Sequence, residues 1–476
     1  MKKTKFDLRK ELAIAEFEFI IKKYILPLLD TKGNLKFHDQ SEYNNQLIKF
    51  SNENNTSTVI FYPCVSAKNK PSPFNYSIQI YSSSALKKRA ESILRELLKV
   101  AEFNCLDFSK QRDYGKKTSQ EMTYKIRTLD IAFEIGMCKW LTEQETEATI
   151  LHTLICRLIE WTSKTYEGKK VPFGIIIDFD KTADKKAADY LHFLQNDSSA
   201  VFSDGIFSGI LLDKTGKVLS FLTKDTNNEI TTSDNSKEIF VPFQFADIAK
   251  YCKENSIGVI ALSNGEIIII KNQSICFAKR GSKWIAFDWT RVYEKMRPYF
   301  LLNNKDEKEI KRKLVKIYCT LLDVSFSHTG GCLSIVIPSE ENNINEVINE
   351  RIDLLAIGSK IEGISQESKE KIEILTYLLT YPESRIRSFF EIEKPLRKEI
   401  LSLDGATVVS TNGNFYCAGS IVSVPSGSSG GGRTAATKKL SNYGIGIKIS
   451  EDGYIEAYGK NINSNTPRII PLFKFK

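Results

Sequence analysis

Histidine is scarce in this sequence and the cysteines are dispersed, which limits the metal sites and disulfides that it predicts. Four of the 476 residues are histidine, and none of the nine cysteines belongs to a C-x-x-C pair. The cysteines stand singly in mostly apolar surroundings, at positions 64, 105, 138, 156, 252, 276, 319, 332 and 417. This pattern predicts reduced, buried thiols rather than disulfides. A Cys/His metal cluster is not expected.

Long apolar runs and clustered basic residues are also missing. No run reaches the ~18 apolar residues that a membrane helix needs. The basic start of the chain is followed by Glu11, Glu16 and Glu18, unlike a signal peptide. We therefore expect a cytoplasmic protein that does not contact a membrane. The net charge of +9 suits an anionic ligand, although lysine-rich solvated faces give the same number. Because no stretch interleaves Lys/Arg clusters with aromatics, nucleic acid is not the expected partner.

The composition, with 42% hydrophobic and 26% charged residues, is that of a globular protein, and the length predicts two or three domains. We expect an α/β protein with mixed sheets. Three regions are predicted: an N-terminal α/β region over residues 1–144, a middle domain over 145–300 and a C-terminal domain over 301–476. In the first region, helical spacing of apolar residues predicts helices over 5–29 and 85–100, strand-like runs lie at 58–63 and 76–81, and the polar stretch 51–57 is predicted to be a loop.

Two blocks of the sequence, on either side of the polar segment 302–313, share an order of features. Each block has a helix, a buried strand, an Asp-Gly step before a second strand, and a closing hairpin. In the later block these are helix 314–326, strand 332–338, Asp404-Gly405 and the hairpin from Gly444; in the earlier block they are helix 151–162, strand 171–178, Asp204-Gly205 and the hairpin from Ile257. The order predicts an internal duplication, and chance similarity of generic α/β units is the alternative. The earlier copy would lack the helical insert around 350–400.

Asp404, Gly405 and Ala406 join a helical region to the strand predicted at 407–410. An Asp at such a turn can hydrogen-bond to its own backbone. It can equally present a carboxylate to a divalent ion that bridges it to phosphates. An isolated Asp-Gly-Ala favours the first interpretation.

A Ser/Gly run at 426–432 leads directly into Arg433 and Thr434 and a small-residue helix. Glycines there let the backbone adopt positive φ and approach a ligand closely. Successive amides can form an anion-binding concavity, and a phosphate would also lie at the positive end of the following helix. Arg433 offers a guanidinium that matches phosphate oxygens. The alternative is a flexible linker, but linkers seldom run straight from a strand into such a helix.

Together these segments resemble the diadenylate cyclase (DAC) domain family over about 314–458. The resemblance rests on the order of T-G-G-x-L-x-I-V-I, L-D-G-A-x-V-V, a Gly-rich loop ending in G-R-T-A-A, and I-x-I-S-E-D-G-x-I. It implies that Asp404, Gly405 and Ala406 match the D-G-A motif, whose Asp handles the metal and the attacking 3′-hydroxyl. It further implies a role for the residues that match the phosphate loop, the closing Ser-Glu and the Thr-Gly before the first strand: Gly430, Gly431, Gly432, Arg433, Thr434, Ser450, Glu451, Thr329 and Gly330.

By this resemblance Asp404 and Glu451 are the expected Mg²⁺ or Mn²⁺ ligands and the expected catalytic residues. The sequence departs from the family where Gly432-Arg433-Thr434 replaces Arg-His-Arg. The motif has no histidine, and the nearest one in sequence, His328, lies outside it. Single contacts of the kind lost are typically worth on the order of 10²–10³ in rate. We therefore expect a sensor that binds ATP or a cyclic dinucleotide with weak or no turnover.

The alternative is an active diadenylate cyclase, a nucleotidyltransferase that joins two ATP into cyclic di-AMP with release of pyrophosphate. Cyclisation needs two ATP-loaded sites that face each other. The upstream copy could occupy the partner position within one chain, which would favour sensing, or two chains could pair as a homodimer through their DAC-like domains. The earlier block keeps Asp204-Gly205 but has Val241–Ala246 in place of the Gly-rich loop. It is predicted to be a degenerate copy that binds no nucleotide, with Asp204 as a turn residue.

Overall fold

A computed structural model describes residues 19–25, 34–38, 48–53, 56–61, 75–80, 92–97, 100, 119–142, 144–163, 172–194, 203–223, 239–348, 366–381, 385–422, 431–462 and 468–476. The chain divides into two compact units: the first comprises 1–224, 252–272 and 278–285, and the second 225–251, 273–277 and 286–476. Among the described residues, no helix combines the length and the apolar character needed to span a membrane. The described cysteines are free thiols, and six of the seven are buried.

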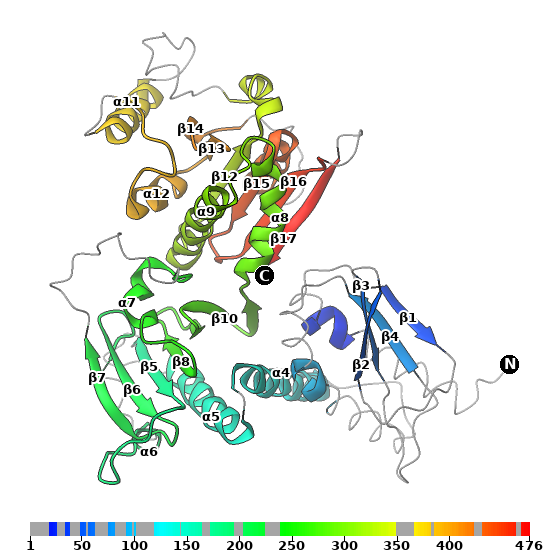
Figure 1. The fold of residues 1–476 in the computed structure, drawn as a ribbon, viewed down its shortest axis with the longest axis vertical. Helices are drawn as coiled ribbons and strands as arrows, with labels where there is room; N and C mark the ends of the chain where they lie inside the picture. Colours follow the sequence, from blue (N-terminus) through cyan, green and yellow to red (C-terminus); the bar gives the residue numbers. More distant parts are fainter. Residues whose placement is uncertain are drawn as a thin grey trace. The chain divides into compact units, whose positions relative to one another are not determined.

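A four-stranded antiparallel sheet lies in the N-terminal region of the first unit (Figure 1). Its strands are β1 (Asn34–His38), β2 (Ile48–Glu53), β3 (Thr56–Phe61) and β4 (Asn75–Ile80), in the order β1-β4-β3-β2. The strands predicted at 58–63 and 76–81 correspond to β3 and β4. The loop predicted at 51–57 is wrong for residues 51–53 and 56–57, which form the end of β2 and the start of β3, and residues 54 and 55 lie outside the described residues. A strand ladder satisfies the backbone without requiring apolar side chains.

The described parts of the predicted N-terminal helices are short. Within 5–29 the described residues include a π-helical turn at Ile21–Ile25, and the rest of that prediction lies outside the described residues. Residues 92–97 are helical. Gly136 lets α4 (Ser119–Leu141) pack closely on that segment, because a Cβ there would lie 2.5 Å from the Ile93 Cα. The helix predicted at 151–162 is confirmed as part of α5 (Glu145–Thr162), which packs on α4.

The first unit also contributes most of a seven-stranded mixed sheet, in the order β11-β10-β9-β8-β5-β6-β7. Its strands are β5 (Phe173–Asp178), β6 (Ser208–Asp213), β7 (Val218–Thr223), β8 (Ser256–Ala261), β9 (Ile267–Lys271), β10 (Ser274–Arg280) and β11 (Lys283–Ala286). The short helices α6 (Tyr190–Phe193) and α7 (Ala246–Ala249) precede β6 and β8 in sequence. Central β5 is buried along its whole length, as its apolar sequence FGIIID dictates.

The second unit is built on a six-stranded mixed sheet, in the order β14-β13-β12-β15-β16-β17. Its strands are β12 (Gly331–Val336), β13 (Ala406–Ser410), β14 (Phe415–Ser420), β15 (Gly444–Ile449), β16 (Ile455–Lys460) and β17 (Ile469–Phe475). Its longer helices are α8 (Trp289–Leu301), α9 (Glu307–Ser327), α11 (Gln366–Thr380), α12 (Lys394–Leu401) and α13 (Gly432–Leu440).

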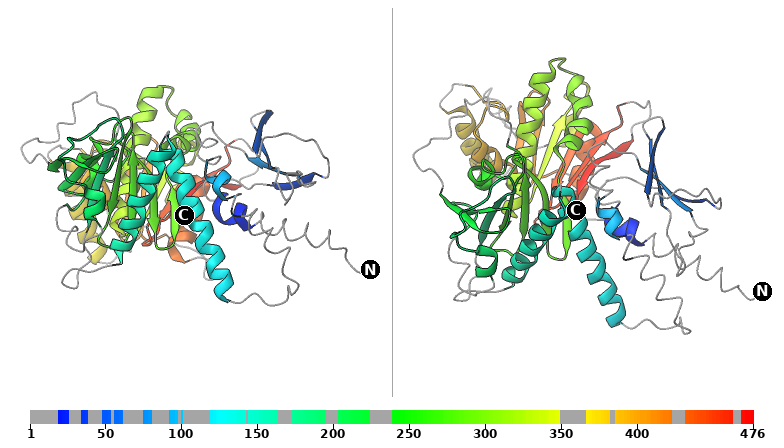
Figure 2. Two further views of the ribbon diagram at one scale, coloured as in Figure 1. Left: turned by 90° about the horizontal axis from the view of Figure 1, so that it is seen from below. Right: turned by 60° about the horizontal axis from the view of Figure 1, so that its bottom comes forward.

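Helices cover both faces of the six-stranded sheet. Figure 2 shows α8 and α9 side by side on one face, where the Tyr299 hydroxyl of α8 occupies the place of a Cβ on Gly459. The backbone of α12 is close to Gly331 on the same face. Gly446 points the opposite way in β15, and there a Cβ would lie 2.3 Å from the Thr437 carbonyl oxygen of α13. α13 therefore lies on the other face.

The two mixed sheets share a topology. In each, the first two strands in sequence are parallel neighbours (β5 and β6, β12 and β13), and the third is an antiparallel outer neighbour of the second. The fourth pairs antiparallel with the other side of the first (β8 on β5, β15 on β12), and the fifth follows it. The prediction of an α/β fold with mixed sheets is confirmed, and the recurring order seen in the sequence reappears as a recurring strand order.

Candidate functional site

Four segments singled out in the sequence meet at one edge of the six-stranded sheet. β12 and β13 run parallel, so the residues before them, Thr329-Gly330 and Asp404-Gly405, lie at the same edge. β15 runs antiparallel to β12 and ends there, because Gly331 pairs with Ile449, and Ser450-Glu451 follow directly. α13 reaches this edge with its first turn, where Arg433 contacts Glu451.

An ion pair joins α13 to the β15–β16 turn. Arg433 Nη1 donates to Glu451 Oε1 over 2.9 Å, and the two side chains are 30% and 72% exposed. Gly330 makes room for this pair: its φ is +71°, and a Cβ built there would lie 2.5 Å from Arg433 Nη1. Such an exposed pair contributes little to stability. It leaves the guanidinium at the surface, where an anion could replace Glu451 as its partner.

The N-terminus of α13 has the geometry that the glycine-rich sequence predicts. Its N-cap residue, Gly431, has φ +82° and has no side chain that could accept hydrogen bonds from the first-turn amides. A Cβ at Gly431 or Gly432 would meet no atom of the described residues within 4 Å, so packing does not require these glycines. The backbone conformation requires the first of them. An uncapped helix N-terminus with open space beside it favours anions. Gly430 and the preceding Ser/Gly run lie outside the described residues.

Within Asp-Gly-Ala, the three residues have separate roles. Asp404 is exposed, and its Oδ1 accepts a hydrogen bond from the Gly405 amide over 3.1 Å. Gly405 has φ +103°, and a Cβ there would lie 2.6 Å from the Gly419 carbonyl carbon, so a close backbone approach explains the glycine. Ala406 is a buried strand residue. Only Asp404 offers a polar side chain to the edge.

Three further predicted residues are engaged in local structure. The Thr329 hydroxyl lies 2.7 Å from the Ser402 hydroxyl and ties the start of β12 to the loop before β13. Ser450 Oγ accepts the Tyr454 amide over 3.1 Å within the β15–β16 turn. Thr434 is buried, and its hydroxyl accepts Lys448 Nζ over 2.8 Å. Thr434 could therefore contact an anion through its backbone amide, and Lys448 adds positive charge beneath the first turn.

The field at this edge is partly cationic. Burial raises the pKa of the Cys332 thiol on β12 to about 11, while the Thr437 hydroxyl and the nearby Arg433 guanidinium act in the opposite direction. Arg433, Lys448 and the start of α13 supply positive charge, and Asp404 and Glu451 supply carboxylates. This combination can hold a phosphate together with a divalent cation, since carboxylate oxygens are preferred ligands of Mg²⁺ and Mn²⁺.

One histidine at this edge was missed by reasoning along the sequence. His328 ends α9 in the left-handed region, with φ 57°, and its Nδ1 lies 2.8 Å from the Glu451 carbonyl oxygen. Because a carbonyl can only accept, Nδ1 carries a proton in this contact. The motif itself has no histidine, but the fold brings His328 to the same turn as Glu451. The sequence did contain a signal for this position, because His328 directly precedes Thr329-Gly330, which the resemblance assigns to the site.

The corresponding edge of the seven-stranded sheet is different. Asp204 lies before β6, and its Oδ1 accepts the amides of Ile206, Phe207 and Ser208 over 2.7–2.9 Å. Burial alone would raise the pKa of Asp204, but these hydrogen bonds and one from the Ser208 hydroxyl hold it below its usual value. The expectation that Asp204 is a turn residue agrees with these contacts.

Comparison of this chain with protein-family models, with curated proteins and with solved structures finds no match.

Proposed function

We propose that the second unit binds ATP or a cyclic dinucleotide through its phosphates and acts as a nucleotide sensor of the DAC-like type. The carrying observation is the convergence at one sheet edge of the uncapped α13 N-terminus, Arg433 and two exposed carboxylates. A phosphate at this place would accept hydrogen bonds from first-turn amides and from the guanidinium. Glu451, which holds Arg433, is mostly exposed and would release it to a stronger anionic partner.

Asp404 and Glu451 are the residues that would hold Mg²⁺ or Mn²⁺ with the nucleotide. The donor set fits, because both carboxylates are exposed and oxygen ligands suit these ions. Such an ion would neutralise phosphate charge. Glu451 would then have to leave Arg433, so ion and phosphate binding are expected to reinforce each other. The single guanidinium in Gly432-Arg433-Thr434, where the family motif has two, supports binding without efficient turnover.

The recurring strand order supports a tandem DAC-like architecture. We infer that residues 145–300 form a degenerate copy of the domain in 301–476, because both build their mixed sheets by the same strand pairings. In the degenerate copy, Asp204 is held by backbone amides, and the helix before β8 is α7 rather than a glycine-led helix such as α13. Nucleotide binding would then be confined to the second unit, and pairing of two chains would occur through their intact copies.

One observation favours the alternative, an active diadenylate cyclase. His328 contacts the Glu451 backbone, so an imidazole lies at the turn where the predicted metal ligand sits, although the motif lacks one. Two chains paired through this edge would then join two ATP into cyclic di-AMP and pyrophosphate.

The test is incubation of the full chain with labelled ATP and Mn²⁺, followed by separation of products and measurement of bound nucleotide. The sensor proposal predicts bound ATP without cyclic di-AMP. Arg433→Ala should weaken binding by about 10–100-fold, the value of one or two charge-assisted hydrogen bonds. Arg312→Ala, an exposed arginine on α9, is the matched control and should bind as the wild type does.

Each other outcome decides against the sensor. Cyclic di-AMP that disappears in Asp404→Ala would establish the cyclase instead. Absence of any nucleotide binding would contradict both functions.

A further inference from the structure

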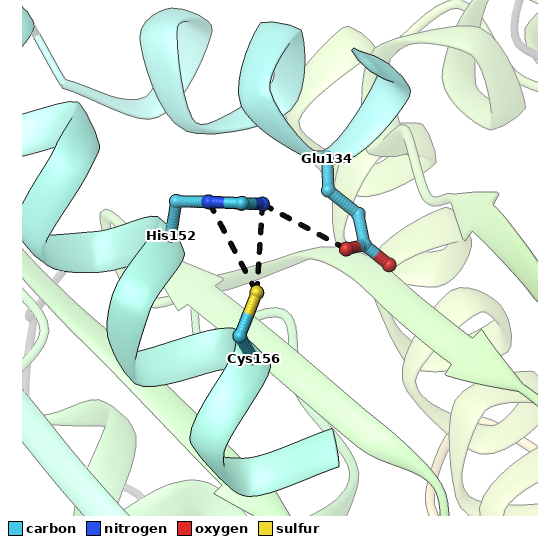
Figure 3. A group of neighbouring side chains, drawn as sticks. All are labelled: Glu134, His152 and Cys156. Atoms are coloured by element: carbon cyan, nitrogen blue, oxygen red, sulfur yellow. Dashed lines mark hydrogen bonds and ion pairs between the residues drawn. The ribbon is translucent and has the colours of Figure 1, made fainter. Parts of the chain in front are cut away.

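A polar cluster in the first unit lies between α4 and α5. His152 and Cys156 are one turn apart on α5, and Glu134 faces them from α4 (Figure 3). One oxygen of Glu134, one ring nitrogen of His152 and the sulfur of Cys156 all lie within 4.8 Å of one another. The Glu134 residue is buried, with 4% of its surface exposed, and the other two are partly buried.

The distances between these atoms are close to those expected around one metal ion. His152 Nε2 lies 3.6 Å from Cys156 Sγ and 3.9 Å from Glu134 Oε2. The second distance is too long for a hydrogen bond. A tetrahedral zinc ion with ordinary bond lengths of about 2.0–2.3 Å would separate nitrogen and sulfur by about 3.6 Å and nitrogen and oxygen by about 3.4 Å. Small side-chain shifts would therefore bring the three atoms onto one ion.

Contacts behind Glu134 direct one of its oxygens toward this cluster. Oε1 accepts Lys279 Nζ over 2.7 Å and the Trp284 indole N–H over 2.9 Å. Oε2 is the oxygen that faces His152. Outer partners that fix one carboxylate oxygen and leave the other for a cation are typical of metal centres. The sequence shows only that His152 and Cys156 are one helical turn apart, because the third ligand comes from the preceding helix, α4.

The cluster combines a buried carboxylate with a thiol. Lys279 is ion-paired with the Oε1 atom of Glu134, and Oε2 is the carboxylate oxygen on the side of His152. A thiolate beside a buried carboxylate is unfavourable, and a divalent cation removes that repulsion while the thiol proton leaves to solvent.

We propose that Glu134, His152 and Cys156 form a zinc-type site that clamps α4 to α5. The ligand set of one oxygen, one nitrogen and one sulfur suits zinc, or cobalt in its place, better than Mg²⁺ or Ca²⁺. With three protein ligands among the described residues, the fourth position is left to water. Zinc binding here would contradict the expectation, based on scattered cysteines and histidines, that a Cys/His metal cluster is absent. The site is independent of the proposed nucleotide site.

The test uses the full chain, stripped with a chelator and titrated with Co²⁺. The proposal predicts one Co²⁺ per chain, with visible absorption typical of tetrahedral cobalt and a thiolate-to-cobalt charge-transfer band in the near ultraviolet. Zn²⁺ should displace the cobalt and remove both signals. Cys156→Ser should lose the charge-transfer band, and His152→Gln should bind at least about 10-fold more weakly.

Matched controls are His192→Gln and Cys252→Ser, which change another histidine and another buried cysteine of the same unit. Both should titrate as the wild type does. Circular dichroism of each variant shows whether it is folded, and the wild-type spectrum is decisive without any variant. A wild-type titration with no tetrahedral cobalt signal would overturn the proposal, as would a charge-transfer band that persists in Cys156→Ser.

Discussion

Asp204 and Asp404 stand before the second strand of two sheets that share a strand order, yet their carboxylates do different things. Asp204 accepts three backbone amides in a turn that delays the start of β6 until Ser208. Asp404 leads almost directly into β13 and stays exposed. The same strand order therefore accommodates an Asp-Gly step whose Asp is a turn residue and one whose Asp is exposed. We expect the neighbouring segments, above all the helix before the fourth strand, to determine whether a ligand binds at that edge.

The largest expected difference is in stability. Asp204→Ala removes the acceptor of several amide hydrogen bonds and should lower the free energy of unfolding by about 3 kcal/mol, whereas Asp404→Ala should change it by less than about 0.5 kcal/mol. Chemical denaturation at pH 7 measures both. Because the folded pKa of Asp204 is lowered, its contribution is present above its unfolded pKa and is lost as the pH falls through the folded pKa. Equal effects of the two substitutions would remove the contrast between the edges.

The second predicted effect is a pH dependence of stability, and it distinguishes α9, the helix before β12, from α5, the helix before β5. α9 buries an acid, Asp323, whose pKa burial raises to about 6 despite Lys394 and the Phe243 amide. The first-turn acids of α5 are the exposed Glu145 and the partly buried Glu147. A raised pKa means that the folded state binds the proton more tightly. Stability should therefore fall as the pH rises from about 4 to about 6, by on the order of 2 kcal/mol, and then level off.

Asp323→Asn should flatten that part of the profile, because the amide oxygen can still accept the Phe243 N–H. Unfolding measured between pH 4 and 7 tests this, with the exposed Asp452→Asn as control. A slope that persists in Asp323→Asn would assign it to other groups.

The smallest predicted change in stability comes from replacing either of two glycines with positive φ. Gly281 and Gly330 have φ of +58° and +71°, but a Cβ at Gly281 meets no described atom within 4 Å, whereas one at Gly330 meets Arg433. Gly281→Ala should cost about 1 kcal/mol from backbone strain alone. Gly330→Ala should cost slightly more and also weaken nucleotide binding by displacing the guanidinium. Similar nucleotide affinity in both variants would show that the position of Arg433 is unimportant.

Much of the second unit could be predicted from sequence because its signals are local. The apolar run Cys332–Pro338 predicts β12, and the turn at Asn412-Gly413 predicts the β13–β14 hairpin, since glycine there has φ +87°. These local signals do not predict that Thr329, Asp404, Arg433 and Glu451 belong to one site. That expectation came from the family resemblance. The structure brings their segments to one edge through strand pairings that no local pattern contains.

The remaining features depend on tertiary contacts. Residues 51–53 at the end of β2 and 56–57 at the start of β3 are polar and pair with each other, so the loop predicted there was wrong. β17 was not predicted, although it pairs with β16. His328 reaches the Glu451 turn because distant segments pack together, and Glu134 reaches His152 and Cys156 because α4 packs on α5. The spacing of residues along one helix shows only the ligands that this helix carries, here His152 and Cys156.

If one edge of this chain binds nucleotide phosphates and the topologically equivalent edge does not, the full chain should hold a single ATP. Equilibrium dialysis of the full chain with labelled ATP and Mn²⁺, beside labelled adenosine, measures this. We expect one ATP per chain, adenosine bound at least about 10-fold more weakly because it lacks phosphates, and ATP bound about 10–100-fold more weakly by Arg433→Ala but not by Arg312→Ala. Two ATP per chain, or an ATP affinity unchanged in Arg433→Ala, would refute the proposed site.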